Sequence, residues 1–232
     1  MVKTGTNNKK SDLTVKAYMA IRQMLFYNEI QPGQKIKYKD LATKIGVSMT
    51  PVIQALKWLE FINIVRHESN KGYYINEVSI TEIKEVYDTR LLLEVSLVPE
   101  IILHLNDQRI SLLAATLDNY KAAVAEDNYH KRIITDMKFH MTLASLSRCH
   151  IQVKMLQELF DILLLRYNQN LFYLSMTGTS LAEHEKIFNS VKNRDQVSLE
   201  ASLRCHVDKV RTHIIKGMSR LVPDKKESFL RP

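Results

Sequence analysis

Residues 37–59, KYKDLATKIGVSMTPVIQALKWL, carry the pattern of two short helices joined by a tight turn. Leu41, Ala42 and Ile45 recur at helical spacing and give the first helix one apolar face. Gly46 can end that helix, because glycine adopts positive φ at little cost. Pro51 fits the first turn of a second helix. The apolar stripe of this second helix comprises Val52, Ala55, Leu56 and Leu59.

The residues after the second helix predict a β-hairpin. Residues 64–68 (IVRHE) and 73–76 (YYIN) are short runs typical of strands, and the turn between them ends in Gly72. Two helices followed by a hairpin form a winged helix-turn-helix, whose second helix can enter the DNA major groove. The alternative is an ordinary pair of helices inside an all-α protein. Such a pair would not need a β-hairpin directly after it.

Composition and length bound the class of protein. A chain of 232 residues is long enough for two modest domains, and 45% hydrophobic residues with only 6 Gly and 5 Pro predict a packed core. The two cysteines, Cys149 and Cys205, have no paired spacing, which indicates a reducing compartment. No run of 18 apolar residues occurs, and MVKTGTNNKK lacks the apolar core of a signal peptide. We therefore expect a cytoplasmic protein that does not enter a membrane.

The positive charge is concentrated near the N-terminus. The whole chain has a net charge of +8, and residues 1–77 hold 12 Lys and Arg against 6 Asp and Glu. Residues 78–232 hold 21 against 19. Because neutralisation of phosphates drives DNA binding, the excess lies where a DNA-binding domain needs it. A merely solvated basic face is the alternative.

The rest of the chain changes character and predicts long amphipathic helices. The expected fold is mostly α, with a winged helix-turn-helix domain over residues 1–77 and an all-helical bundle over residues 78–232. Pro99 should kink or interrupt the first helix of the bundle. The expected helices lie near residues 79–106, 107–127, 129–148, 151–177, 179–193 and 195–218.

A set of histidines in the helical half is a candidate metal site. Asp136 and His140 are four residues apart, so one helix projects both side chains from the same face. His184 and His206 lie on separate later helices. Three imidazoles and one carboxylate suit a divalent ion such as zinc. Alternatively, each histidine is a surface or hydrogen-bonded core residue. If there is a metal site, His213 competes with His206 for the fourth ligand position.

The N-terminal pattern PGQKI…LATKIGVSMTPVIQALKWLE…IV…KGYYI resembles the DNA-binding domain of the GntR family of bacterial transcription regulators over about residues 12–77. Family members usually carry arginine at the positions of Met49 and Ile53, and glutamate at that of Gln54. Neither Met49 nor Ile53 can make the bidentate guanine contact of arginine. The residues expected at double-stranded operator DNA are Lys37, Lys39, Lys44, Ser48, Met49, Thr50, Ile53, Gln54, Lys57, Lys71 and Gly72.

Residues 85–94, EVYDTRLLLE, resemble the opening of the FCD effector domain of the FadR subgroup. This resemblance implies that Asp136, His140, His184 and His206 bind a metal ion, zinc by preference with nickel or manganese as alternatives. It also implies that the metal helps to hold a small effector, often a carboxylate. Arg90 and Lys138 are the candidates for additional attraction of such an anion.

The leading functional hypothesis is a dimeric, effector-responsive transcriptional repressor without enzymatic activity. Two other classes stay open. One is a metal-dependent enzyme with a DNA-binding head, in which Glu183 or Glu185 would act as the general base. The other is a nucleoid-type DNA binder without an effector. The apolar helix face that includes Leu156 and Phe160 is either core or part of a dimer seam.

Overall fold

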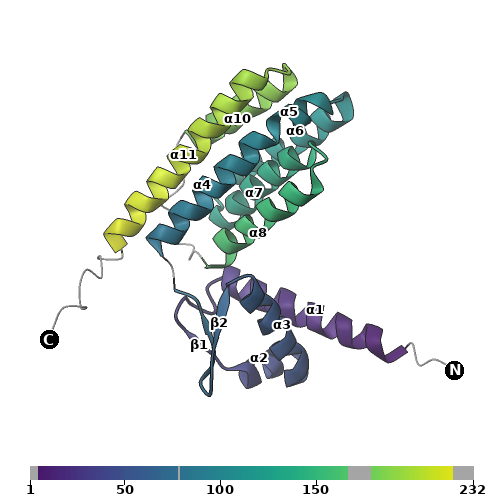
Figure 1. Cartoon of the computed structure of the whole chain (residues 1–232), viewed down its shortest axis with the longest axis vertical. Helices are drawn as coiled ribbons and strands as arrows, with labels where there is room; N and C mark the ends of the chain where they lie inside the picture. The colour runs from purple at the N-terminus through teal and green to yellow at the C-terminus, as the bar shows by residue number, and fades with distance from the viewer. Residues whose placement is uncertain (1–4, 78, 167–178, 222–232) are drawn as a thin grey trace. The chain divides into compact units, whose positions relative to one another are not determined.

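The computed structural model describes residues 5–77, 79–166 and 179–221 (Figure 1). The chain divides into two compact units. The first comprises Met1–Val78 with Asp161–Gln169, and the second comprises Ser79–Phe160 with Asn170–Pro232. None of the described helices is long and apolar enough to cross a membrane.

Within residues 5–77, the first unit contains three helices and three short strands. In chain order they are α1 (Gly5–Phe26), β1 (Lys35–Ile36), α2 (Tyr38–Ile45), α3 (Met49–Phe61), β2 (Val65–Glu68) and β3 (Gly72–Ile75). Helices α1 and α3 pack against each other, and α2 packs on both. The core takes Ile21 from α1, Leu56 and Leu59 from α3, and Ile75 from β3, each fully buried.

The helix-turn-helix is confirmed. Helix α2 ends at Ile45, and Gly46 follows with φ of 72°, as expected of a residue that reverses the chain after a helix. The amide of Val47 donates to the Ala42 carbonyl across this turn. Helix α3 then begins after Ser48, whose side chain makes no capping hydrogen bond.

The wing is confirmed as an antiparallel hairpin, but it has a third strand at residues 35–36, where the sequence predicts only a short link between helices. The strand order is β1-β3-β2. In β1, Lys35 pairs with Tyr74 and Ile36 with Tyr73. A strand of two residues is too short to show an alternating pattern, so periodicity could not reveal it.

Helix α1 differs from the expectation at both ends. It begins at Gly5, although the polar and basic composition of residues 1–10 predicts a flexible lead. No Pro or Gly follows Gly5 before the end of the helix, so nothing in this polar segment stops it. The sequence Gln31-Pro32-Gly33 predicts a turn that ends this helix, but the helix already ends at Phe26, because Asn28 adopts a left-handed conformation with φ of 57°.

The second unit is all-helical in its described part. Its helices are α4 (Ile80–Ser96), α5 (Val98–Leu103), α6 (Asp107–Ala125), α7 (Tyr129–Ser145), α8 (His150–Arg166), α10 (Ser180–Lys192) and α11 (Gln196–Leu221). The end of α8, from Asp161, belongs to the first unit. The predicted helix 151–177 extends into residues that lie outside the described part.

Side-chain caps and Pro99 set the helix boundaries of this bundle. The side chains of Ser79, Asn106 and Asn128 accept hydrogen bonds from the backbone at the N-termini of α4, α6 and α7. The predicted interruption at Pro99 is confirmed: α4 ends at Ser96, and α5 begins at Val98 with the proline in its first turn.

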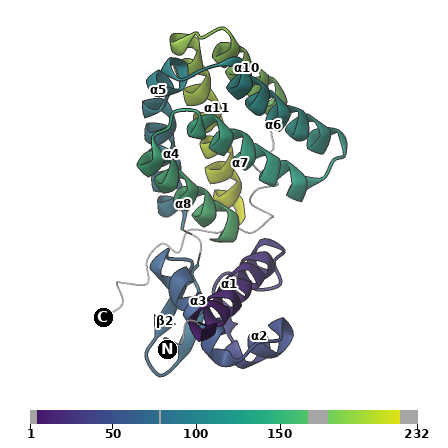
Figure 2. The ribbon, with the colours of Figure 1, turned by 90° about the vertical axis from the view of Figure 1, so that its right-hand side faces the viewer.

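The helices of the bundle pack both against the next helix in the chain and against helices that are distant in sequence. Helix α11 runs along α4 and α10, while α6 lies against α7 and α10 (Figure 2). Large side chains fill the space between them, including the fully buried Tyr87, Tyr120, Phe139 and Phe160. This packing brings α7, α10 and α11 together, and these three helices carry the predicted metal ligands.

Candidate metal centre and nucleic-acid interface

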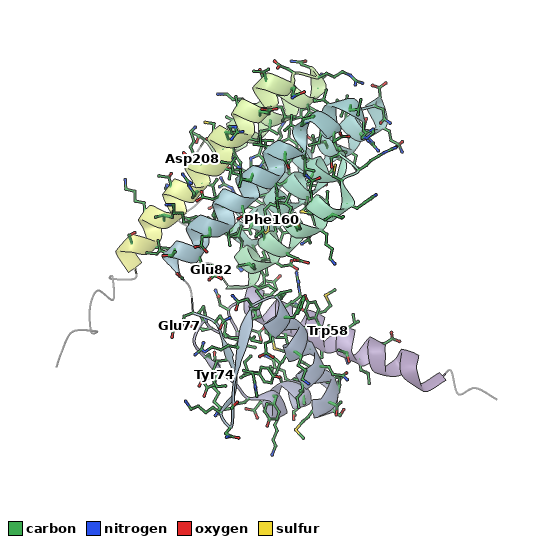
Figure 3. The ribbon with its side chains drawn as sticks, in the orientation of Figure 1. Trp58, Tyr74, Glu77, Glu82, Phe160 and Asp208 are labelled. Carbon is green, nitrogen blue, oxygen red and sulfur yellow. The ribbon has the colours of Figure 1, made fainter. Side chains whose placement is uncertain are left out.

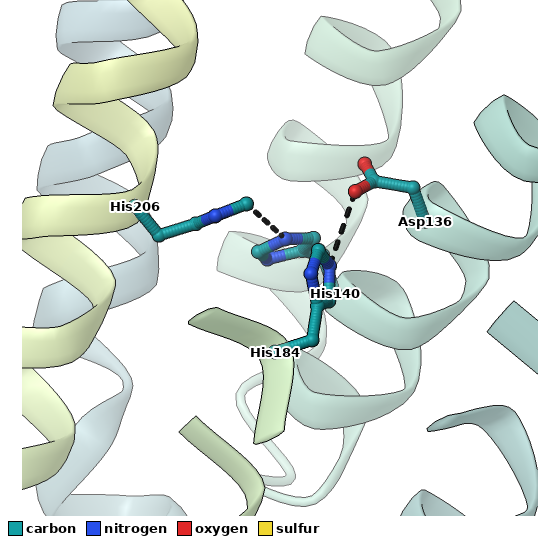
Figure 4. Close-up of side chains that lie close together, drawn as sticks. All are labelled: Asp136, His140, His184 and His206. Atoms are coloured by element: carbon teal, nitrogen blue, oxygen red, sulfur yellow. Dashed lines mark hydrogen bonds and ion pairs between the residues drawn. The ribbon is translucent and has the colours of Figure 1, made fainter. Parts of the chain in front are cut away.

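Four side chains from three helices converge in the second unit (Figure 4). Asp136 and His140 come from α7, His184 from α10 and His206 from α11. One ligand atom from each lies within 4.8 Å of the corresponding atoms of the others. The three imidazoles are at most 1% exposed, whereas the Asp136 side chain is 27% exposed. Of the four members, Asp136 is therefore the one most accessible to solvent.

Each imidazole is oriented by an acceptor at its Nδ1 atom. His140 Nδ1 lies 2.7 Å from Glu94 Oε2, and His206 Nδ1 lies 2.9 Å from Glu183 Oε2. His184 Nδ1 lies 2.8 Å from the Ser180 carbonyl oxygen. Because these oxygens accept, each Nδ1 carries the proton and donates it. In the neutral tautomer this leaves all three Nε2 atoms as bare acceptors.

The three Nε2 atoms face one another. His140 Nε2 and His206 Nε2 are 3.2 Å apart, and a hydrogen bond between them would require one ring to be an imidazolium. Burial works against that state: it lowers the pKa of His140, and it lowers the pKa of His206 to about 4. Two lone pairs at this distance repel unless a cation lies between them.

His184 Nε2 is the buried polar atom that points most directly to a missing partner. It lies 3.1 Å from Asp136 Oδ1, yet it has no hydrogen-bond partner among the described residues. Both atoms are acceptors when His184 is neutral with its proton on Nδ1, and only an imidazolium could donate from Nε2 to Asp136. Burying a polar atom without a hydrogen-bond partner costs free energy. A cation bound by both His184 Nε2 and Asp136 Oδ1 would remove this cost.

The donor set fits a divalent metal ion. Two nitrogen ligands of a tetrahedral zinc, each at roughly 2.05 Å, lie about 3.3 Å apart. The His140–His206 and His184–Asp136 separations of 3.2 and 3.1 Å agree with this value. Metal-bound histidines usually donate their other ring N–H to a carboxylate or a carbonyl, as all three do here.

Glu94 links the cluster to Arg90 on the same helix. Its Oε2 accepts from His140, and its Oε1 is paired with Arg90 Nε. Burial opposes ionisation of Glu94, but the neighbouring Arg90 and His140 outweigh it and lower the pKa of the carboxyl to about 2. The Arg90 guanidinium carbon lies 4.6 Å from the centroid of the Phe160 ring. Arg90 Nη2 is buried without a hydrogen-bond partner among the described residues.

The structure does not bring every predicted effector residue to the cluster. Lys138 is exposed. It lies two residues from both Asp136 and His140 on α7, and a spacing of two places it near the opposite face of the helix. We therefore leave Lys138 out of the site. His213, the competing choice for the fourth position, is also exposed.

Sequence reasoning missed the partners that orient the ligands. Glu94, Glu183 and the carbonyl of Ser180 had no recognisable signal, because any carboxylate or backbone oxygen can serve. The Glu183 carboxylate also accepts from Lys209 Nζ at 2.9 Å. Burial opposes its ionisation, but His206 and Lys209 lower its pKa to about 2.

In the first unit, the predicted DNA contacts lie on α2, α3 and the wing. Met49 is 43% exposed at the start of α3, and Ile53 is half-buried one turn later. The Gly72 backbone is half-buried in the wing. The other candidates are exposed: Lys37, Lys39, Lys44, Ser48, Thr50, Gln54, Lys57 and Lys71.

Three of these side chains already have protein partners. Gln54 Oε1 accepts a hydrogen bond of 2.7 Å from Thr14 on α1. Lys44 is paired with Glu29, and Lys71 Nζ lies 3.3 Å from Glu68. These acidic partners offset part of the positive charge of the two lysines.

The wing carries two further cations that the sequence analysis did not select. Arg66 and Lys35 both lie over the Tyr74 ring, at 5.2 and 5.9 Å from its centroid (Figure 3 labels Tyr74). They belong to β2 and β1. Only the pairing of β1 with β3 places Lys35 beside the wing, and that pairing was not predicted.

The fold and the two groups of residues define a class of protein: a DNA-binding regulator with a winged helix-turn-helix and a helical sensor domain. Family comparison gives the particular family. The FCD domain matches residues 85–209, and the family described as bacterial regulatory proteins, gntR family, matches residues 13–75. The chain belongs to the GntR family of transcriptional regulators, with an FCD effector domain.

Individual relatives agree with this assignment. An uncharacterized HTH-type transcriptional regulator YdhC from Bacillus subtilis is 23% identical over 95% of this chain and 97% of its own length. The gluconate operon transcriptional repressor of the same species is 25% identical over 88% and 86%. The structure of E. coli McbR/YncC covers 90% of this chain and 99% of its own, with a TM-score of 0.74 and 19% identity. These relatives are regulators and not enzymes.

Replacing Glu94 by Gln should weaken metal binding by roughly 10- to 100-fold, because His140 loses the carboxylate that orients it and raises its basicity. The measurement is competition for Zn²⁺ against a chromophoric chelator, with the full-length protein. Glu185→Gln is the matched control, since Glu185 lies on α10 but pairs with Lys121 at the surface. Equal zinc affinity in all three proteins would contradict the assignment of Glu94 as an orienting partner.

Replacing Lys57 or Lys71 by Ala should weaken DNA binding and reduce its salt dependence by about one phosphate contact each. Binding is measured by fluorescence anisotropy over a series of salt concentrations. Lys121→Ala, which removes an equivalent exposed charge from the second unit, should leave both quantities unchanged. If neither substitution in the first unit alters affinity, α3 and the wing do not contact DNA as expected.

Proposed function

We propose that this protein is a sequence-specific transcriptional repressor of the FadR subgroup, acting in the cytoplasm as a homodimer. Its operator affinity changes when a small carboxylate effector binds at a divalent metal ion in the FCD domain. The observation that carries the proposal is the convergence of three imidazole Nε2 atoms, each with its Nδ1 hydrogen-bonded elsewhere, on the Asp136 carboxylate.

The charge of the cluster supports an anionic effector. His140, His184 and His206 are neutral ligands in this arrangement, and Asp136 contributes one negative charge. A bound divalent ion, which is zinc, nickel or manganese in this proposal, supplies a net positive charge and coordination positions for an oxygen ligand. Anions are therefore favoured over neutral molecules at this place.

Arg90 is the residue of this chain that we assign to the effector besides the metal ligands. Its Nε is committed to Glu94, but Nη2 is buried and without a partner among the described residues. A carboxylate oxygen is the usual acceptor for such a guanidinium N–H. Glu94 pairs with Arg90 and accepts a hydrogen bond from His140. A ligand bound to Arg90 would therefore act on His140 through this single carboxylate.

One relative and one general property of helix-turn-helix proteins support repression by a dimer. The gluconate operon transcriptional repressor, with 25% identity over most of both chains, is a repressor by name. Helix-turn-helix proteins bind symmetric operators as dimers, which place two recognition helices in neighbouring major grooves.

In the enzymatic alternative, the two glutamates considered as the general base, Glu183 and Glu185, both have other partners in the described structure. The Glu183 carboxylate is occupied by His206 on one oxygen and by Thr179 and Lys209 on the other. Glu185 is exposed and paired with Lys121. Neither glutamate is placed to activate water at the cluster, so we do not propose catalysis.

The proposal is tested by measuring operator binding with and without zinc and carboxylates. The operator is first selected from a random DNA pool with the full-length protein. A panel of small mono- and dicarboxylates is then added to zinc-loaded protein, and one of them should change DNA affinity by roughly 5- to 150-fold. His184→Ala should abolish this response while leaving effector-free DNA binding intact.

Two results would contradict the proposal. If the random pool yields no preferred sequence, the protein is not a sequence-specific regulator. If carboxylates change DNA affinity equally in the wild type and in His184→Ala, the metal cluster is not the effector site.

A further inference from the structure

We propose that α3 reads the operator partly through thymine methyl groups instead of through guanine. This inference rests on the proposed function as a sequence-specific DNA-binding protein. It concerns the first two turns of α3, which are the part of a recognition helix that meets the base edges.

The base-facing part of α3 is uncharged. Between Lys44 and Lys57 no residue carries a charged side chain. Met49 is 43% exposed, and Ile53, one turn later, remains partly exposed. Residues four apart on a helix share a face, so these two form a small apolar surface at the start of α3.

The chemistry of the major groove decides what such a surface can recognise. Guanine presents two acceptors, N7 and O6, and only a donor side chain can read them. Met and Ile have no donor. Thymine presents its C5 methyl group, which makes apolar contacts that exclude water. Met49 and Ile53 therefore favour thymine and make no hydrogen bond to guanine.

Gln54 adds a hydrogen-bond donor beside this apolar surface. Glutamine reads adenine by using its oxygen and its nitrogen together. Here Gln54 Oε1 accepts from Thr14 Oγ1 at 2.7 Å, and Thr14 is only 3% exposed. The buried hydroxyl therefore draws the amide oxygen towards α1 and leaves the amide NH₂ as the group available to DNA. This NH₂ group can donate to thymine O4 and equally to guanine O6 or N7, so Gln54 adds a hydrogen bond without choosing between these two bases.

Positive charge enters later along the helix and from other elements. Lys57 lies two turns after Met49, and the wing adds Lys71 at its tip. These cations serve the phosphates and supply affinity that does not depend on sequence. Sequence preference is then left to the apolar surface of Met49 and Ile53 and to Gln54.

The test replaces thymine by deoxyuridine in the operator selected from a random pool. Deoxyuridine keeps the base pair and O4 but lacks the C5 methyl group. At one or two thymines of each half-site, the substitution should lower the affinity of full-length protein by about four-fold per methyl, the loss expected for one buried methyl group. Deoxyuridine in the flanking DNA should have no effect.

Protein variants connect the methyl effect to its residues. In Met49→Ala and Ile53→Ala the deoxyuridine effect should shrink at the thymine that each side chain contacts. Met19→Ala is the control, because it removes the same side chain from an exposed position on α1. Met49→Arg should shift the selected sequence towards guanine at the same base pair.

Several outcomes would overturn the inference. They are a selected operator without thymine at these positions, deoxyuridine substitutions that cost nothing, or an effect unchanged in both alanine variants. In each of these cases sequence-specific binding survives, so the proposed regulator stands while this mode of readout fails. A pool that yields no preferred sequence would overturn both.

Discussion

Three imidazole nitrogens that cannot hydrogen-bond to one another are held together at the centre of the helical unit. Glu94, Glu183 and the Ser180 carbonyl accept hydrogen bonds from the Nδ1–H groups of His140, His206 and His184, respectively. This leaves bare Nε2 atoms facing one another and the carboxylate of Asp136. Packing of this kind is unfavourable without a cation, which makes the cluster a site for binding more than for stability.

The supporting residues form a continuous network around this cluster. Glu94 connects His140 to Arg90, and Glu183 connects His206 to Lys209. These contacts tie His140 on α7 to α4, and His206 on α11 to Glu183 on α10. In the first unit the corresponding constraint is the buried Thr14, which fixes the orientation of Gln54 on α3.

Much of the fold was readable from the sequence, because its signals are local. The stop at Gly46 and the interruption at Pro99 depend on backbone preferences that act within a few residues. The four residues of the cluster could be chosen because Asp136 and His140 share a helix face and because the pattern resembles the FCD domain. Strand β1 and the acceptors behind the histidines could not be found, since each depends on contacts between segments far apart in the sequence.

The most direct test of the central claim is the protonation of the three histidines, observed by nitrogen-15 NMR of the full-length protein. The account predicts Nδ1–H tautomers at His140, His184 and His206, with all three Nε2 resonances moving to metal-bound values when Zn²⁺ is added. Protonated Nε2 atoms that do not respond to Zn²⁺ would contradict it and would make the cluster a set of hydrogen-bonded core residues.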